Sequence, residues 1–176
     1  DEEASARHQK LFIDGLLPPD ELQLVTSAEA MQIAGAVLTL PPEAMHLYLP
    51  RAGTLRPAAL VDALLGDCPV SAEPAPPGSA IFDARGVAST GGRVWPVTAS
   101  RGQIDRFDCP PPACAVTFGN YIAALDGQTV TGATYHPARS DDIPRTSADD
   151  SATNRAAAAR ILPRLASAPH TDERAA

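Results

Sequence analysis

The sequence predicts an α+β fold, in which a mainly antiparallel or mixed β-sheet is flanked by helices. A hairpin is the strongest indication, because residues 114–135 form two strand-like runs joined by Asp126-Gly127. A long strand-like run precedes the hairpin at 94–107, and an alanine-rich helical run follows it at 151–162. The 176 residues, 44% hydrophobic and 20% charged, suffice for one domain with a core.

The register of this hairpin follows from its turn. A type I′ turn needs positive φ at both central residues, which Asp-Gly tolerates. With that turn, three pairs of residues face each other: Leu125 with Gln128, Ala123 with Val130, and Tyr121 with Gly132. Alternation then places five residues on one face: Tyr121, Ala123, Val130, Gly132 and Thr134.

An aromatic residue opposite a glycine leaves a gap on this face. A flat ligand, a backbone or the Tyr121 ring itself could fill the space over Gly132. Ordinary packing of the ring against the bare glycine is the alternative to a ligand site, and spacing alone leaves both interpretations open.

Short helices are predicted in the first part of the chain. Residues 4–16 fit one helix, and 20–25 fit a further helical turn. The run 27–34 fits a helix with Ser27 as its N-cap and Gly35 as its C-cap.

A strand, a glycine loop and a helix are predicted next. The strand covers 45–49, the loop 50–56 contains Gly53, and the helix runs from Pro57 to Leu65. Two short strands are then expected, at 68–73 and 79–84.

The long strand 94–107 contains Gly102, between Arg101 and Gln103. A glycine inside a strand indicates either a bulge or the close approach of another backbone. After the hairpin, Ser147 begins a capping box ahead of the helix at 151–162. The last residues, 167–176, are predicted to be a flexible tail.

Charge and cysteine content limit the class of protein. The net charge of −7 argues against a general phosphate-binding surface. The odd set of Cys68, Cys109 and Cys114 suggests a reducing compartment, so we expect free thiols in a cytoplasmic protein instead of a Cys109–Cys114 pair. The sequence contains no apolar run of membrane-spanning length and no signal peptide, so no membrane partner is expected. It begins without a methionine, as if cut from a longer chain.

No complete active site is visible in the sequence. The histidines lack metal-ligand spacing, and neither a GxGxxG unit nor a Walker loop is present. The carboxylate pairs 141–142 and 149–150 are explained by a loop and by a helix start. We therefore predict no catalytic residue and no metal ligand, and a domain that contributes to a site without carrying one alone.

Three stretches, 48–65, 96–107 and 119–142, together resemble the FAD-dependent D-amino-acid-oxidase-like superfamily. That superfamily has a Pro-x-x-Gly segment before a Pro-started helix, a strand with Arg-Gly-Gln, and a Gly-Tyr hairpin that ends in Gly-Ala-Thr/Ser-Tyr. Within it, the chain most resembles the oxidoreductase half of MnmC-type tRNA-modifying proteins, through GATYHPARSDD and the later Asp149-Asp150 and Asn154. The resemblance covers residues 16–165.

The resemblance implies a substrate-binding domain at 1–166 of a flavoenzyme that oxidises an amine C–N bond. It implies four substrate-binding residues, Tyr121, Arg101, Gln103 and Thr134, and three cofactor-binding glycines, Gly53, Gly102 and Gly132. The implied cofactor is FAD, and the implied partners are the remainder of the parent flavoenzyme and an amine substrate. In the MnmC-like case, the substrate is the carboxymethylaminomethyl group of a tRNA wobble uridine.

The chain departs from the superfamily pattern in three respects. It has no GxGxxG unit, Ala124 replaces the usual proline of the hairpin, and the connection 65–79 is short. We therefore expect FAD to require residues outside this chain, and the chain alone to be inactive. The alternative is a non-catalytic remnant or ligand-binding domain that no longer binds FAD.

Overall fold

The computed structural model of the chain describes residues 10, 15, 18–71, 73, 74, 76–78, 99–138 and 143–175. Its contacts divide the chain into two compact units. The first unit comprises 1–54, 102–135 and 144–176, and the second comprises 55–101 and 136–143. The helix predicted at 4–16 and the strand predicted at 79–84 fall outside the described residues, apart from Lys10 and Gly15.

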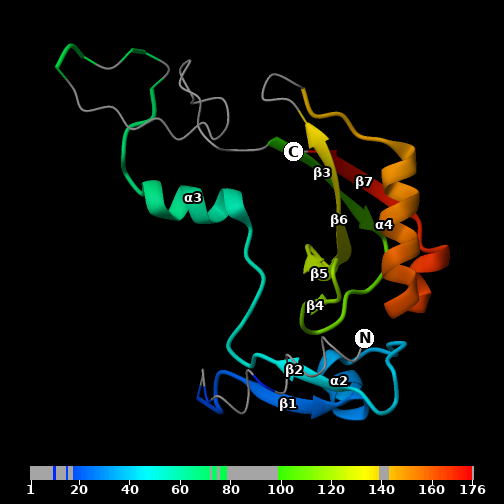
Figure 1. The fold of residues 1–176 in the computed structure, drawn as a ribbon. Helices are drawn as coiled ribbons and strands as arrows, with labels where there is room; N and C mark the ends of the chain where they lie inside the picture. The colour runs from blue at the N-terminus through cyan, green and yellow to red at the C-terminus, as the bar shows by residue number, and fades with distance from the viewer. Residues whose placement is uncertain are drawn as a thin grey trace. The chain divides into compact units, whose positions relative to one another are not determined.

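A small two-stranded sheet and a helix form the start of the first unit (Figure 1). Strand β1 (Gln23–Thr26) pairs antiparallel with β2 (Met45–Tyr48), and α2 (Ser27–Ala34) follows β1 directly. The helical turn predicted at 20–25 is therefore wrong, because pairing with β2 draws these residues into a strand. The predicted strand β2 and the C-cap Gly35 are confirmed.

The N-cap of α2 is Thr26, not Ser27 as predicted. Thr26 and Glu29 form a complete capping box: the Thr26 side chain accepts from the Glu29 N–H, and the Glu29 carboxylate accepts from the Thr26 N–H at 2.7 Å. Ser27 is the first helical residue, and its hydroxyl donates to the Pro41 carbonyl at 2.6 Å. The cap lies one residue earlier because only Thr26 has Glu three positions ahead.

A five-stranded sheet forms the centre of the first unit, in the order β4-β5-β6-β3-β7. The strands are β3 (Ala99–Phe107), β4 (Val116–Thr117), β5 (Tyr121–Leu125), β6 (Gln128–Ala138) and β7 (His170–Ala175). The pairs β4-β5, β5-β6 and β3-β7 are antiparallel. Strands β3 and β6 also run in opposite directions, since Gly102 lies beside Thr134 and Ile104 beside Gly132.

The predicted hairpin is confirmed. Asp126 and Gly127 both have positive φ, of 54° and 76°, as a type I′ turn requires. The register pairs Tyr121 with Gly132, Ala123 with Val130 and Leu125 with Gln128. The turn chemistry was therefore sufficient to predict both strands and their pairing.

A helix and a 3₁₀ turn cover one face of this sheet. Helix α4 (Ala148–Ile161) begins at the predicted N-cap Ser147, and η2 (Pro163–Ser167) follows it. Their apolar residues form a core with the sheet and with the end of α2: Ala34, Leu38, Phe107, Ile122, Ala158, Leu162 and Leu165. Burial of these side chains attaches α4 to the sheet.

The flexible tail predicted at 167–176 is wrong for most of its length. Residues 170–175 form β7, an edge strand that pairs antiparallel with β3. The segment is polar, HTDERA, so it lacks the apolar alternation that marks a half-buried strand. It is a strand because β3 supplies a partner for its backbone. Charged residues on an edge strand also hinder pairing with a further chain.

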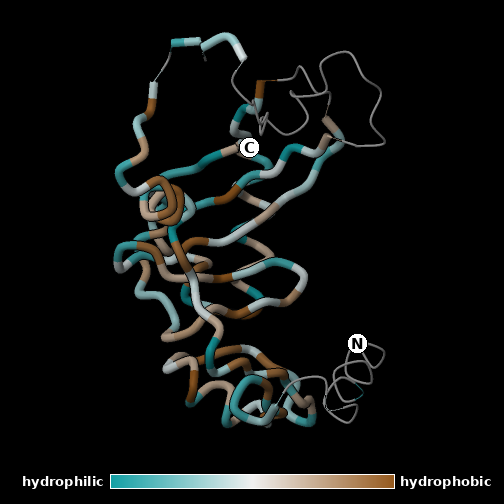
Figure 2. The backbone as a smooth tube through the Cα atoms, turned by 90° about the vertical axis from the view of Figure 1, so that its left-hand side faces the viewer, coloured by the Kyte–Doolittle hydropathy of each residue, from teal (hydrophilic) through white to brown (hydrophobic). Residues whose placement is uncertain are grey.

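The second unit contains α3 (Pro57–Leu65), which starts at the predicted proline. All nine residues of α3 are exposed, although the helix is strongly apolar, as its brown colour in Figure 2 shows. The strand predicted at 68–73 is not present in the described residues of that stretch. None of the helices in the described ranges is long and apolar enough to span a membrane.

Candidate functional site

The two faces of the five-stranded sheet have different chemistry. Side chains alternate along β3, so Gln103, Asp105 and Phe107 point toward α4, while Gly102 and Ile104 belong to the opposite face. On β5, Ile122 is part of the α4 core, which places Tyr121 on the opposite face. The predicted site residues are divided between these two faces.

On the α4 face, a buried carboxylate is the centre of a polar network. Asp105 is 1% exposed and accepts hydrogen bonds from four side chains. The donors are Ser151 Oγ at 2.5 Å, Asn154 Nδ2 at 2.6 Å, His170 Nε2 at 3.0 Å and Gln103 Nε2 at 3.3 Å. They come from α4, β7 and β3, so one carboxylate joins three elements.

Gln103, predicted to bind substrate, belongs to this network. Its side chain has no exposed surface. Its Oε1 accepts from the Ser147 N–H at 2.7 Å, and its Nε2 donates to the Ser147 carbonyl at 3.1 Å and to Ser151 Oγ at 2.8 Å. These bonds hold the first turn of α4 against β3, which is a structural role.

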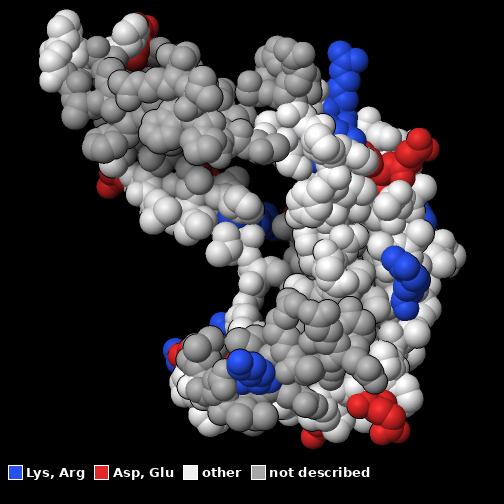
Figure 3. All heavy atoms as spheres, viewed as in Figure 1, with Lys and Arg blue, Asp and Glu red and all other residues white. Residues whose placement is uncertain are grey.

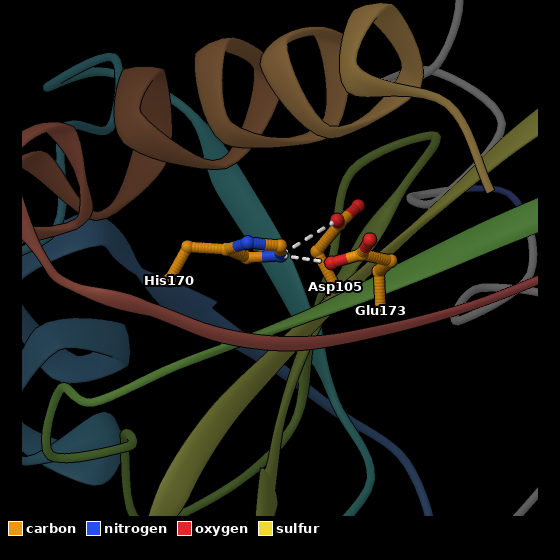
Figure 4. Close-up of side chains that lie close together, drawn as sticks. All are labelled: Asp105, His170 and Glu173. Carbon is orange, nitrogen blue, oxygen red and sulfur yellow. Dashed lines mark hydrogen bonds and ion pairs between the residues drawn. The ribbon is translucent and has the colours of Figure 1, made fainter.

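One ring nitrogen of His170 faces two carboxylates, those of Asp105 and Glu173, as Figure 4 shows. Its Nε2 is 3.0 Å from Asp105 Oδ1 and 3.4 Å from Glu173 Oε2, and its ring lies 5.3 Å from that of Phe107, centroid to centroid. These three residues could offer ligand atoms to a metal, since the atoms lie within 4.8 Å of one another. The Asp105 carboxylate, however, already accepts four hydrogen bonds, which matches its approximate lone-pair capacity. Hydrogen bonding accounts for the cluster, and we assign no metal to it.

The opposite face carries the predicted pair of Tyr121 and Gly132. A Cβ on Gly132 would lie 2.9 Å from Ile104 Cγ2 and 3.0 Å from the Gln103 carbonyl oxygen. The sequence left three alternatives for this gap: a flat ligand, a backbone or the Tyr121 ring. The structure shows the neighbouring strand β3 in that place. Tyr121 is half-buried, and burial, with a smaller contribution from Tyr135, raises the pKa of its phenol above 10.0. The phenol therefore stays neutral throughout the physiological pH range.

Gly102 marks a close approach of backbones, one of the two alternatives predicted for it. A Cβ there would lie 2.9 Å from the Thr134 carbonyl oxygen, 3.7 Å from Ala133 Cβ and 3.9 Å from Tyr135 Cδ1. Ala133 and Tyr135 thus approach the Gly102 side of the sheet. The sequence predicted that Thr134 would share a face with Tyr121 and Gly132, because side chains alternate along a strand. That alternation does not account for the approach of Ala133 and Tyr135 to Gly102. The Thr134 hydroxyl is buried, without a hydrogen-bond partner among the described residues.

Arg101 and Gly53 are the other two predicted site residues. Arg101 is partly buried near the start of β3, and Gly53 is exposed in the loop after β2. A Cβ on Gly53 would have no described heavy atom within 4 Å. The ligand roles of Tyr121, Arg101 and Thr134 remain predictions.

Three glycines were predicted to bind FAD. Contact between β3 and β6 explains why Gly102 and Gly132 lack side chains, and Gly53 adjoins open space in the described structure. The cofactor-binding role of these glycines remains a prediction, and we derive no redox step through them.

Sequence reasoning missed the residues that the structure connects most densely. Asp105 and Ser151 were not singled out, Asn154 was noted only as part of the sequence resemblance, and His170 was considered only for metal spacing. The available signal was a polar pattern at 103 and 105 inside an otherwise buried strand. Such a pattern indicates polar partners on a covering helix, but it does not identify them.

Comparison with known proteins supports the fold. The chain matches no protein-family model and no curated protein. Its structure is similar to the crystal structure of glycine oxidase from Geobacillus kaustophilus, with a TM-score of 0.63 and 19% sequence identity. The similarity covers 99% of this chain and 55% of the oxidase, so the chain spans about half the length of that protein. The predicted α+β class is confirmed, and the chain is similar in fold to this glycine oxidase.

Proposed function

We propose that this chain is the substrate-binding part of an FAD-dependent oxidoreductase that oxidises an amine C–N bond. The observation that carries the proposal is the similarity to a glycine oxidase over 99% of this chain. The hairpin that presents Tyr121 opposite Gly132 adds support, because the resemblance in sequence led to the same residues.

In such an enzyme, the cofactor and this chain would have different roles. FAD would supply the hydride acceptor for oxidation at the carbon next to the amine nitrogen. This chain contributes a sheet face that orients the amine and excludes water. The proposal assigns no flavin-binding role to Gly102 and Gly132, because contact between β3 and β6 explains why they lack side chains.

Tyr121 is the residue proposed to orient the amine. Its half-buried phenol stays neutral because burial raises its pKa, so its ring face and hydroxyl oxygen remain available to an amine N–H. The alternative remains packing of the ring within the sheet, and mutation separates the two.

Amine oxidation by the natural protein that contains this chain tests the proposal. The purified protein is supplied with FAD, and hydrogen peroxide release is measured with glycine and with other primary and secondary amines. We expect turnover with at least one amine, and Tyr121→Phe to lower kcat/KM about tenfold through loss of one hydrogen bond to a charged group. Tyr48→Phe, on the separate small sheet, is the matched control. Failure of every amine to be oxidised, or equal turnover of both variants, contradicts the corresponding part of the proposal.

The finer proposal concerns the substrate. We propose the carboxymethylaminomethyl group of a tRNA wobble uridine, by the sequence resemblance alone. The chain carries a net charge of −7, and charged side chains of both signs are scattered over the face shown in Figure 3. Binding of tRNA would therefore need basic surface from other residues. Oxidation of that modified tRNA, compared with glycine in the same assay, decides between the two substrate classes.

A second candidate is a ligand-binding domain that no longer uses FAD. The observation that favours it is the packing role of the two strand glycines, which leaves them no evident cofactor role. Absorption spectra of the 176-residue chain, and of the natural protein, before and after addition of FAD separate the two. A bound-flavin spectrum in the natural protein supports the enzyme, and its absence there supports the second candidate.

A further inference from the structure

Tyr135 is an exposed aromatic residue on the face of the sheet that bears Tyr121. It is 72% exposed and follows Thr134 on β6. Its ring edge lies on the side of β3 that Gly102 leaves bare, since a Cβ on Gly102 would be 3.9 Å from Tyr135 Cδ1. A large side chain at position 102 would therefore compete with the Tyr135 ring for space.

Tyr135 also affects the Tyr121 phenol electrostatically. A negative charge on Tyr135 disfavours the ionised form of Tyr121 and so contributes to its raised pKa. Tyr121 lies on β5 opposite Gly132, and Tyr135 lies three residues further along β6. Both residues thus belong to the face of the sheet that carries Gly102 and Ile104.

We propose that Tyr135 is a second ligand-positioning residue, which acts together with Tyr121 on the cationic group of an amine. This inference rests on the proposed function and adds to it a residue that the sequence did not indicate. The two residues are called the tyrosine pair below.

The chemistry of the tyrosine pair suits a protonated amine. Tyrosine ring faces attract cations, and each neutral phenol oxygen accepts a hydrogen bond from an N–H. A protonated primary amine has three N–H donors, so two phenols can orient it without an ion pair. The net charge of −7 also favours the approach of a cation over that of an anion.

Titration of the phenols tests the pair independently of any activity. The chain contains only three tyrosines, Tyr48, Tyr121 and Tyr135, so ¹³C labelling of the ring carbon that bears the hydroxyl gives three signals. We expect Tyr135→Phe to lower the pKa of Tyr121 toward its ordinary value, and Tyr48→Phe to leave it unchanged. An unchanged Tyr121 titration in Tyr135→Phe would overturn the pairing.

The same signals test the ligand. Glycine and methylamine, added to the chain at neutral pH, are expected to shift the Tyr121 and Tyr135 signals and not the Tyr48 signal. Tyr135→Ala should raise the Kd about threefold or more, as loss of one cation–aromatic contact predicts. Absence of any shift, or an unchanged Kd in Tyr135→Ala, overturns the ligand role.

Steady-state kinetics of the natural protein separate this inference from the proposed function. Amine oxidation with an unchanged KM in Tyr135→Ala would overturn the inference and leave the function standing. Binding of amines at the tyrosine pair without any oxidation would overturn the function and leave the pair standing. A raised KM with nearly unchanged kcat in Tyr135→Ala, absent from Tyr48→Phe, is the expected result.

Discussion

The two faces of the five-stranded sheet use polar groups in opposite ways. On the α4 face, the Asp105 carboxylate is buried and satisfied by four donors. On the other face, Tyr121 is half-buried and Tyr135 is 72% exposed. A buried polar group whose hydrogen bonds are complete has none to offer a ligand, so polarity on the α4 face indicates stability. Partly exposed aromatic residues with hydroxyl groups are the ones available for binding.

The contrast also separates two kinds of predicted site residue. Gln103 and Tyr121 were both predicted to bind substrate from the same resemblance. The structure places Gln103 in the buried hydrogen-bond network of the α4 face and Tyr121 on the other face. A motif can therefore combine a residue that holds the fold with one that lies outside this network.

The largest expected effect is that of Asp105→Ala. It removes a buried acceptor from four side-chain donors on three elements, so the free energy of unfolding should fall by about 3–5 kcal/mol. Urea denaturation followed by circular dichroism measures it. Asp108→Ala, an exposed neighbour, should change stability by less than about 0.5 kcal/mol. Equal effects of the two variants would contradict a dominant role for the network.

Gly132→Ala should have the second largest effect, and should lower the free energy of unfolding by about 2 kcal/mol because of overpacking. Its Cβ would lie 2.9 Å from Ile104 Cγ2, so β3 and β6 would have to separate. Thermal unfolding measures the loss, and Gly53→Ala is the matched control because its Cβ would meet open space in the described structure. Unchanged stability of Gly132→Ala would show that the sheet can relax around the added methyl group. The interpretation of the gap opposite Tyr121 as a ligand site would then stand again.

Ser151→Ala should have a smaller effect, about 1 kcal/mol. The hydroxyl donates to Asp105 and accepts from Gln103, yet Asp105 keeps three other donors when it is removed. Urea denaturation compares it with Thr153→Ala, an exposed residue of the same helix. Stability of Ser151→Ala equal to that of Thr153→Ala would contradict a contribution from this bond.

The smallest effect concerns Tyr121 at alkaline pH. Because the folded-state pKa is raised, the folded protein holds this proton more tightly than the unfolded chain. The resulting stabilisation is fully present below pH 10, the ordinary value, and is lost as the pH rises through the folded-state pKa. Unfolding measured from pH 8 to 11 should show a steeper alkaline decline in the unchanged chain than in Tyr121→Phe. Parallel declines would contradict the raised pKa.

Local chemistry allowed the hairpin and most of the helices to be predicted. Asp126-Gly127 accepts positive φ at both positions, and the register of β5 and β6 follows from that turn. Pro57 at the start of α3, Gly35 after α2 and Ser147 before α4 each act within one or two turns of a helix. These signals need no distant partner, which is why they could be found in the sequence.

Strands that depend on a distant partner could not be predicted. Residues 23–26 read as a helical turn and 170–175 as a tail, yet each is a strand because β2 or β3 lies beside it. Much of the polar network was missed for the same reason, since Asp105 bonds to Asn154 and His170, 49 and 65 positions away. Such contacts depend on how the elements pack.

By itself, the sequence determined the α+β class, the hairpin and the pairing of Tyr121 with Gly132, because turn and cap preferences act between near neighbours. Only the tertiary structure decided that Gln103 is buried beneath α4, that neighbouring strands explain Gly102 and Gly132, and that Tyr135 stands exposed on the face of Tyr121. Burial and the approach of strands arise from packing between segments distant in the chain. Those properties separate residues that hold the fold from residues that are free to bind.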